Sequence, residues 1–504
     1  MNILLVYPEM PDTFWSMKYA TKVFGKKAMY PPLGLITISN LLPSTWKKKL
    51  VDLNVTALTK ENILWADYIF ISAMNVQEES ARIIISECKK LNKKIVAGGT
   101  LFTHEFDKFS EVDHFVLNEA EITLPLFLND LTHNTLKKIY STEQFANVEE
   151  SPLPDWSLVD VKNYHYAIVQ YSRGCPYNCD FCDVTSLFGR KPRTKTSVQI
   201  INELNEIAKY ENFPFILFAD DNLIGNRRIL MSDLLPALIE WRKKNNPSVY
   251  FATQVTINLS DDEKLMKLML EAGFRHIFVG IETPDETSLL ESRKTQNLKR
   301  NLLDSIKKLN ENGFIVVGGF IVGFDTDDEG IFQRQIDFIQ ESGIVLATVN
   351  VLKAPPGTEL YERMKNENRL IDGFSFHEGE SNFIPKMNKE ILSKGFDKLI
   401  STVYSPNAIF ERNKKFISTY QFPKTETKIP NPSIKIYLVP FLRSVYLIGI
   451  KSKLRLHYWK TIIWTFINNK NFIDHGVFNG VMIYQLQKLY DKYNFTKNND
   501  SLYS

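Results

Sequence analysis

Short apolar runs and longer stretches of helical pattern alternate along the first 150 residues. Four of the runs are continuous, brief and rich in β-branched side chains, which favours buried parallel strands. They cover residues 3–7, 68–73, 94–99 and 114–119. Residues 77–91 mix charged and apolar positions as a helix does. The alternation predicts an α/β, Rossmann-like sheet with a ligand crevice at the carboxyl ends of its strands.

A second alternation begins near residue 165 and contains six further strand candidates separated by helical stretches. The strand candidates are residues 166–172, 215–220, 249–255, 276–282, 314–323 and 345–352. The helical stretches include residues 198–209, 261–272, 298–311 and 329–341. Such a succession of strand–helix units predicts a partial (β/α)6 barrel of the TIM type, in which the chemistry gathers at the carboxyl ends of the strands.

The pattern changes at two further places and divides the chain. Residues 151–158 (SPLPDWSL) are rich in proline and predict a linker, and after about residue 380 the pattern turns helical and basic. We therefore expect a Rossmann-like domain at 1–150, the barrel at 151–378 and a mostly helical domain at 379–504. A chain of 504 residues is too long for one ordinary core, which agrees with this division.

Composition narrows the class of protein. A hydrophobic content of 44% and a charged content of 24% are typical of a soluble globular chain. The net charge of +3 gives no general case for nucleic-acid binding. No uninterrupted apolar stretch reaches the roughly 20 residues that a membrane-spanning helix needs, and the first residues lack the features of a signal peptide. The sequence predicts a cytoplasmic protein.

The four cysteines carry the clearest chemical signal. Cys175, Cys179 and Cys182 fall within eight residues, directly after the first predicted barrel strand. Thiolates are soft ligands that suit an iron–sulfur cluster or zinc, but a structural zinc site usually has four ligands. No fourth cysteine follows, and the nearest histidine, His165, lies on the other side of the strand. Cys88 lies in the predicted helix at 77–91, where we expect a small buried hydrophobe.

The C-x₃-C-x₂-C motif after a barrel strand resembles the signature of radical S-adenosylmethionine (SAM) enzymes. Further segments follow in order: SRGCPYNCDFCDV, FGRKPRTKT, FADDNLIGN, AGFRHIFVGIETPDE, GFIVGFD and APPGTEL. Together they resemble a subgroup with an N-terminal cobalamin-binding domain and a C-terminal domain of unknown function, to which hopanoid ring-A methylases belong. The resemblance covers nearly the whole chain and is closest over residues 150–375.

The resemblance implies a [4Fe–4S] cluster on the three cysteines, with its fourth iron open to SAM. It also implies that Asp221 and Asn222, at the end of the second barrel strand, help to bind the SAM amino group. Glu282 ends the fourth strand, where it would accept hydrogen bonds from ribose hydroxyls, and Gly319 would permit close approach to the cofactor. The alternatives are a turn or helix-cap role for the polar residues and a simple bend at the glycine.

Cobalamin is the third cofactor that the resemblance implies. Gly98, Gly99 and Thr100 end one strand of the first sheet and Ser72 ends another, where small residues permit close approach. Glu119 belongs to NEAE, which is similar to an acidic loop of the subgroup. The D-x-H-x-x-G motif that supplies an axial histidine in other cobalamin domains is absent, since the loop after the first strand reads PEMPDTFWSM. The cobalt would then carry water, a different side chain or nothing beneath it.

Two basic stretches have alternative interpretations. Arg190, Lys191, Arg193 and Lys195 form either a solvated face or a site for an acidic substrate group. Residues 433–470 contain seven Lys or Arg and no acidic residue, with aromatic side chains between them. They predict either peripheral contact with anionic headgroups or a packed helical domain whose basic side chains extend to solvent.

The favoured function is C-methylation at an unactivated carbon of a lipid-like or natural-product substrate by a cobalamin-dependent radical SAM enzyme. One alternative is a radical cyclase or rearrangement enzyme on the same scaffold, without methyl transfer. Another is a non-catalytic cobalamin- or cluster-based sensor. The expected partners are a small-molecule or lipid substrate and an external one-electron donor such as flavodoxin or ferredoxin, with no nucleic acid. Peripheral contact would then be with the inner face of the membrane.

Overall fold

The computed structural model forms two compact units. The first unit comprises residues 1–11, 27–175 and 184–219, and the second comprises residues 12–26, 176–183 and 220–504. The structure describes all residues from 1 to 504 except 211–212, 375–378, 424–433, 470–471 and 501–504. The predicted domain boundaries at residues 150/151 and 378/379 remain predictions.

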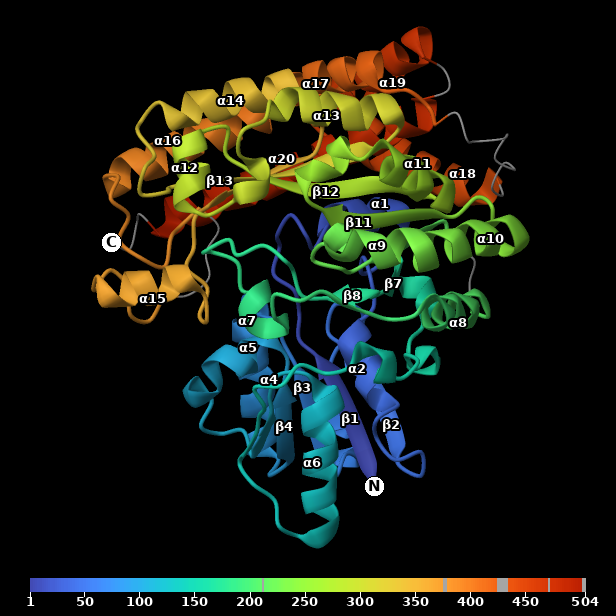
Figure 1. Ribbon diagram of the computed structural model, residues 1–504, viewed down its shortest axis with the longest axis vertical. Helices are drawn as coiled ribbons and strands as arrows, with labels where there is room; N and C mark the ends of the chain where they lie inside the picture. Colours follow the sequence, from blue (N-terminus) through green and yellow to red (C-terminus); the bar gives the residue numbers. More distant parts are fainter. Residues whose placement is uncertain (211–212, 375–378, 424–433, 470–471, 501–504) are drawn as a thin grey trace. The chain divides into compact units, whose positions relative to one another are not determined.

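A six-stranded parallel sheet forms the centre of the first unit (Figure 1). Its order is β2-β1-β3-β4-β5-β6. The strands are β1 (Asn2–Tyr7), β2 (Lys47–Asp52), β3 (Tyr68–Ser72), β4 (Lys94–Gly98), β5 (His114–Val116) and β6 (Ile139–Tyr140). The four predicted strands are confirmed as β1, β3, β4 and β5, whereas β2 and β6 at the two edges were not predicted. The Rossmann-like prediction is correct.

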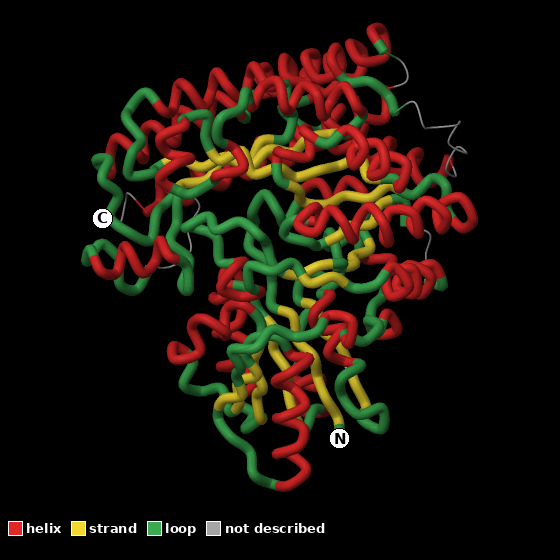
Figure 2. The backbone as a smooth tube through the Cα atoms, viewed as in Figure 1, coloured by secondary structure: helices red, strands yellow, loops and turns green. Residues whose placement is uncertain are grey.

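Alternate side chains of this sheet enter two separate cores. Ile3 and Leu5 belong to a core with α2 (Leu33–Ser39) and α6 (Ala120–His133), while Leu4 and Val6 belong to one with α3 (Lys60–Trp65), α4 (Glu78–Lys90) and α5 (Thr100–Glu105). The helices therefore cover both faces of the strands (Figure 2). Cys88 of α4 is fully buried and burial raises the pKa of its thiol to about 12, which confirms a packing role.

The rest of the first unit carries shorter elements. They are β7 (Ala167–Val169), which pairs in parallel with β10 (Phe215–Phe218), the antiparallel pair β8 (Ser172–Arg173) and β9 (Arg193–Thr194), α7 (Val184–Phe188) and α8 (Ser197–Ala208). The predicted linker 151–158 is packed: Trp156 is buried, and Asp155 accepts a hydrogen bond from Ser39 of α2 at 2.9 Å. This segment is part of the unit and not an exposed connection.

Four parallel strands run side by side in the second unit. They are β11 (Tyr250–Val255), β12 (Phe274–Glu282), β13 (Ile315–Val322) and β14 (Ala347–Val351). Their helices are α9 (Arg227–Ile229), α10 (Leu235–Asn245), α11 (Glu263–Ala272), α12 (Glu286–Glu291), α13 (Leu302–Asn312), α14 (Ile331–Ser342) and α15 (Glu359–Asn366), with a π-helix at Leu230–Leu234. α11 packs against β12 and α13 against β13. Strand–helix alternation is confirmed here.

The described residues from Lys389 onward are mostly helical, as predicted. They form α16 (Lys389–Val403), α17 (Pro406–Thr419), α18 (Ile434–Ser444), the π-helix η10 (Val445–Ile450), α19 (Arg455–Asn468) and α20 (Ile473–Asp500). α1 (Lys18–Phe24) packs into the core of these helices. At the start of α1, the backbone amides of Tyr19 and Ala20 donate to the side-chain oxygen of Gln485 on α20. Within the described residues, no helix is long and apolar enough to cross a bilayer.

Candidate active site

The first cysteine of the motif lies in the first unit, in the loop after β8. The amide of Cys175 donates to the carbonyl of Gly189 at 3.2 Å. The preceding residue, Gly174, has φ +93°, and a Cβ at this position would lie 2.8 Å from the same carbonyl oxygen. Only glycine adopts this conformation at low cost, so the loop is tightly fixed on the segment that follows α7.

Cys179 and Cys182 lie in the second unit, where the amide of Cys182 donates to the carbonyl of Cys179 at 3.2 Å. Cys179 is buried, and the side-chain amide of Gln296 donates to its sulfur at 3.7 Å. Over the ranges that the structure describes, no three Cys, His, Asp or Glu side chains converge on one metal-binding point. The contacts of Cys175 are therefore those within the first unit, and the contacts of Cys179 and Cys182 are those within the second.

A buried ion pair lies at the end of β12. The ammonium group of Lys294 is 2.6 Å from Oε1 of Glu282. Glu282 has φ +65°, an uncommon backbone conformation for a residue with a side chain, and such strain is concentrated at functional sites. A Cβ at Gly280 would overlap the Glu282 carboxylate and lie 2.8 Å from the Lys294 nitrogen. The strand therefore leaves just enough room for this pair.

The same lysine couples electrostatically to the cysteines. Burial alone would lower the pKa of Lys294, but Glu282 and the thiols of Cys179 and Cys182 raise it above its usual value. Burial raises the pKa of the Cys179 thiol, while Lys294 and the Gln296 amide act in the opposite direction. A buried cation and a donor to sulfur both stabilise a thiolate, the form that binds iron. These residues fit a thiolate-bound iron–sulfur cluster.

Three acidic side chains meet near the start of the second unit's sheet. Burial, reinforced by the carboxylates of Asp220 and Asp183, raises the pKa of Asp221 to about 7. Asn222 accepts a hydrogen bond from the amide of Thr256 at 3.3 Å through its side-chain oxygen. Asp221 is thus held where a cationic ligand group, such as an amino group, would relieve the clustered negative charge.

The space beside Gly319 on β13 is filled by an aromatic side chain. A Cβ at Gly319 would lie 2.7 Å from the ring of Phe278 on β12. Trp15 packs against the same ring, with the two ring centroids 4.9 Å apart, and 44% of the Trp15 surface is exposed. In the structure Gly319 therefore makes room for Phe278, and its predicted role at the cofactor remains a prediction.

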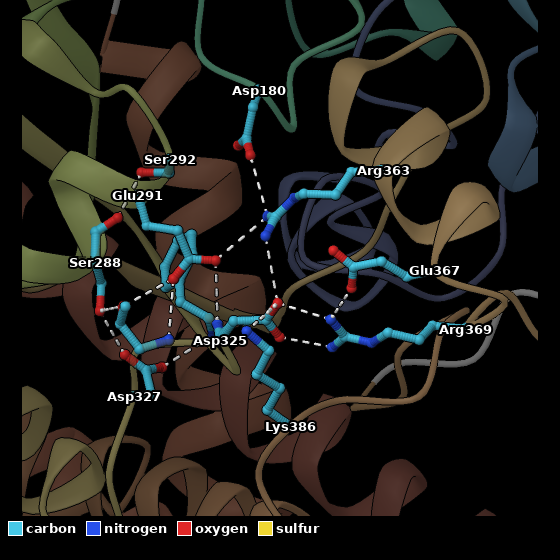
Figure 3. A network of polar contacts seen from close by, with 12 residues as sticks. Asp180, Ser288, Glu291, Ser292, Asp325, Asp327, Arg363, Glu367, Arg369 and Lys386 are labelled. Atoms are coloured by element: carbon cyan, nitrogen blue, oxygen red, sulfur yellow. Dashed lines mark hydrogen bonds and ion pairs between the residues drawn. The ribbon is translucent and has the colours of Figure 1, made fainter.

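Arg363 contacts the loop between Cys179 and Cys182 through the carboxylate of Asp180 (Figure 3). Arg363 of α15 lies 3.3 Å from each of three carboxylates, those of Asp180, Glu291 and Asp325. The backbone of Asp180, the residue after Cys179, also donates to the carbonyl of Ser292 at 3.1 Å. Burial raises the pKa of Asp180 to about 6 despite the arginine. This network fixes the loop between Cys179 and Cys182.

The carboxyl edge of the first unit's sheet brings the predicted cobalamin residues together. Ser72 and Gly98 are register partners at the ends of β3 and β4, and Thr100 begins α5. Gly99 has φ +93°, and a Cβ there would lie 2.9 Å from the Ser72 hydroxyl. The side-chain oxygen of Asn75, in the loop after β3, is buried and lacks a hydrogen-bond partner in the described part of the chain. An unsatisfied buried acceptor fits a ligand rich in amide donors, as a corrin is.

Glu119 follows β5 at the start of α6, and two arginines bind its carboxylate. Arg173 lies 2.8 Å and Arg193 lies 2.9 Å from its two oxygens, and both contacts are buried. Arg173 also binds Glu121 at 2.8 Å, and Ser151 donates to Glu121 at 2.6 Å. Burial opposes ionisation, but these partners lower the pKa of Glu121 to about 2. The network fixes the segment two residues before Cys175.

Neither interpretation of the basic run 190–195 holds for its second half. Arg193 binds Glu119, and Lys195 forms a buried pair with Glu203 of α8 at 2.5 Å. Burial raises the pKa of Glu203, although Lys195 acts against this. These two cations are structural partners of buried carboxylates, so they form neither a solvated face nor a site for a substrate acid. Arg190 and Lys191, in the first half of the run, are exposed to solvent.

Comparison with known proteins agrees with this chemistry. A family model described as the radical SAM superfamily matches residues 169–339, and a domain of unknown function (DUF4070) matches residues 358–498. The chain is 31% identical to the hopanoid C-2 methylase of Rhodopseudomonas palustris over 91% of its length and 88% of that protein. The chain belongs to the radical SAM superfamily. The predictions of a radical SAM enzyme, its iron–sulfur cluster and its SAM cofactor are confirmed.

Two further proteins are similar to this radical SAM enzyme over nearly their whole length. An uncharacterised methyltransferase of Synechocystis sp. is 35% identical over 95% of this chain and 90% of its own. The radical SAM methyltransferase TsrM of Kitasatospora setae, solved with cobalamin and a [4Fe–4S] cluster, has a TM-score of 0.63 at 12% identity and covers 97% of this chain and 99% of its own. The latter likeness shows the fold.

Three residues of the radical SAM site had no signal in the sequence. Lys294 and Gln296 follow α12 in a polar stretch, and nothing in their spacing distinguishes them from surface residues. Arg173 stands beside the cysteine motif, but its partner Glu119 is 54 residues away. Only the fold brings these side chains to the carboxylates and the thiol that they support.

Proposed function

We propose that this radical SAM enzyme transfers a methyl group, by way of cobalamin, to an unactivated carbon of a lipid-like or natural-product substrate. The observation that carries the proposal is the likeness to a hopanoid C-2 methylase along nearly the entire chain. The buried acceptor at Asn75, beside the edge formed by Ser72 and Gly98–Thr100, supports cobalamin as the methyl carrier. Small and hydroxyl-bearing residues at a strand edge suit its nucleotide tail.

The bound cofactors would supply a 5′-deoxyadenosyl radical and a methyl group, and the protein would hold them in place. Cys175, Cys179 and Cys182 would bind three irons of the cluster. Asp221 and Asn222 would orient the SAM amino group, the former through its poorly solvated negative charge. Glu282, fixed by Lys294, would accept hydrogen bonds from ribose hydroxyls.

Glu119 has a positioning role in this proposal. Its carboxylate is occupied by Arg173 and Arg193 and accepts a further hydrogen bond from the amide of Ala146 at 2.8 Å. The acidic loop therefore anchors the strand that leads to Cys175, and the cofactor would be held by its neighbours at the sheet edge.

An apolar substrate fits the aromatic pair on the second unit's sheet. Trp15 and Phe278 are uncharged aromatic side chains in contact with each other, and nearly half of Trp15 is accessible. Radical chemistry requires a dry environment around the substrate carbon, which such side chains provide. An external one-electron donor of the flavodoxin or ferredoxin type would reduce the cluster. We also propose that the enzyme works at the inner face of the membrane, with residues 433–470 near its surface.

Methyl transfer is tested with SAM that carries a labelled methyl group. Anaerobically reconstituted enzyme is incubated with reductant, cobalamin and lipid extract from a strain that lacks the gene, and products are analysed by mass spectrometry. The proposal predicts labelled product heavier by one methylene group. Formation of 5′-deoxyadenosine with an altered product that carries no label would contradict methyl transfer and indicate a cyclase or rearrangement enzyme.

A further inference from the structure

α19 is apolar on two opposite faces, although a surface helix needs only one. Tyr458, Ile462 and the residues around them pack into the core with α20. Leu456 and Ile467 on the other side are 76% and 73% exposed, and Ile463 lies on the same stripe. With about 3.6 residues per turn, spacings of seven and four residues keep these three side chains aligned.

A second apolar stripe runs along the preceding helices. Leu438, Leu442, Tyr446 and Ile450 are exposed and recur every four residues through α18 and the π-helix η10. An α-helix alone would rotate this spacing slowly around its axis, whereas the wider π turn keeps the later members in line. The stripe thus continues over both elements.

Hydrogen bonds join α18 and η10 to α19. The indole of Trp459 donates to the carbonyl of Gly449 at 3.0 Å, and the hydroxyls of Ser444 and Tyr458 are 2.6 Å apart. A Cβ at Gly449 would lie 3.1 Å from the Trp459 nitrogen, so glycine permits the close approach. The helices that carry the two stripes are therefore neighbours within one unit, since η10 contacts both α18 and α19.

Only cations accompany these side chains. The exposed basic residues on α18, α19 and their connection are Arg443, Lys451, Lys453, Arg455 and Lys460. The chain has no Asp or Glu between residues 434 and 468. In the described ranges, none of the five forms an ion pair with a carboxylate. Lys451 instead extends over the ring of Tyr446 at 4.6 Å, with its charge at the rim of the stripe.

We propose that this C-terminal apolar face (Leu438, Leu442, Tyr446, Ile450, Leu456, Ile463, Phe466 and Ile467) inserts into the interface of a bilayer that contains anionic lipids. The apolar side chains replace headgroup water, and the surrounding cations bind phosphate groups. The face lies flat on the bilayer, since no described helix can span it. Binding to a bilayer would bring the enzyme to the lipid-like substrate of the proposed function, but the apolar and basic side chains of the face favour this binding whatever the substrate is.

Charge argues against a second copy of the chain as the occupant. Arg443 packs against Gly25 at the end of α1, and Lys460 lies over the ring of Phe410. Isologous pairing would still bring together two sets of Lys451, Lys453 and Arg455 without a compensating carboxylate on either helix. Like charges across an interface oppose association. A bilayer with phosphatidylglycerol presents the opposite charge over the same area, so it complements both the apolar and the basic components of the face.

Vesicle flotation of the full-length protein tests the proposal. Wild-type protein is expected to float with phosphatidylcholine vesicles that contain phosphatidylglycerol and to bind phosphatidylcholine alone much more weakly, with the difference lost at high salt. Leu456→Ser with Ile467→Ser should weaken binding roughly a hundredfold, because two large side chains no longer leave water. The matched control is Ile83→Ser with Val198→Ser, which changes two exposed apolar residues elsewhere, 55% and 67% accessible, and should bind as wild type does.

Charge is tested separately with Lys451→Gln, Lys453→Gln and Arg455→Gln combined. This variant should lose on the order of a hundredfold on anionic vesicles and little on neutral ones. Circular dichroism and 5′-deoxyadenosine formation from SAM report folding and cofactor chemistry, and both should remain unchanged in every variant. Absence of wild-type binding to anionic vesicles would overturn the proposal, as would a dimer in sedimentation that Leu456→Ser with Ile467→Ser dissociates. Neither outcome depends on whether methyl transfer is observed.

Discussion

Replacing Arg173 by methionine tests the buried ion-pair network before the cysteine motif. Methionine keeps the length and apolar stem of the side chain, but it leaves Glu119 and Glu121 without their shared cation. Both carboxylates are almost fully buried, so they cannot regain their hydration without opening the structure.

Two routes give a similar magnitude for this change. Removing one partner of a buried pair typically destabilises a protein by about 3–5 kcal/mol. Independently, the pKa of Glu121 is lowered from 4.5 to about 2, and at ~1.4 kcal/mol per pKa unit its partners stabilise the ionised form by about 3 kcal/mol. We therefore expect Arg173→Met to lower the free energy of unfolding of the first unit by about 3–5 kcal/mol.

The pH dependence has a definite sign. Because the folded pKa of Glu121 lies below its unfolded value, this stabilisation is complete above pH 4.5 and is lost as pH falls toward about 2. In Arg173→Met the carboxylates bind protons at a higher pH, so the variant should recover part of its deficit relative to wild type on mild acidification.

Hydrogen exchange at increasing urea concentration measures the opening free energy of peptides from the first unit. Arg82→Met is the matched control, since Arg82 forms an exposed pair with Glu78 one helical turn away at 2.7 Å. Arg82 also lies over the ring of Phe109 and donates to the carbonyl of Lys108, so Arg82→Met should cost about 1 kcal/mol, still well below the loss expected for Arg173→Met. Equal opening free energies in Arg173→Met and Arg82→Met would refute the reasoning. So would a double variant, Arg173→Met with Glu121→Gln, whose opening free energy is no higher than that of Arg173→Met alone.

Further predictions concern the second unit. Lys294→Met should shift the reduction potential of the reconstituted cluster downward, because a buried cation beside Cys179 is lost; potentiometric EPR measures this, and an unchanged potential would contradict the coupling. Gly280→Ala should lower the free energy of unfolding, measured by urea titration, by about 1–3 kcal/mol, because the new methyl group overlaps the Glu282–Lys294 pair. An unchanged free energy of unfolding would contradict this steric argument. Because the pKa of Asp221 is raised, its burial destabilises the folded protein by an amount that is absent below about pH 4, grows between about pH 4 and 7 and is constant above that. Asp221→Asn should therefore stabilise cofactor-free protein by up to about 4 kcal/mol at pH 8 and not at pH 4, as urea titration at the two pH values measures.

The sequence predicted those strands whose apolar runs are continuous. β2 was missed because its first three residues are lysines, and its sheet contact uses only alternate positions at an edge. The core position of Trp156 was hidden by the prolines around it, since composition indicates a linker and does not report packing. Local pattern thus identifies elements that bury both faces and misses those that bury one.

The candidate site divides in a similar way. The three cysteines were found because their ligand spacing is local and specific. Lys294 and Gln296 were not, because a single polar residue has no pattern and its role depends on which strand end lies beside it. Arg193 was misread as a surface cation because its carboxylate partner is 74 residues away in the chain. Long-range pairing is the information that single-sequence reasoning lacks.

The central claim is that Cys175, Cys179 and Cys182 hold a [4Fe–4S] cluster that cleaves SAM reductively. The most direct test measures iron content and 5′-deoxyadenosine formation in anaerobically purified protein, with each of the three cysteines replaced in turn by alanine and with Cys88→Ala as the matched control. Each motif variant should lose 5′-deoxyadenosine formation, and the Cys88 variant should keep it. Zinc in place of iron, or unchanged turnover after replacement of all three motif cysteines, would contradict the claim.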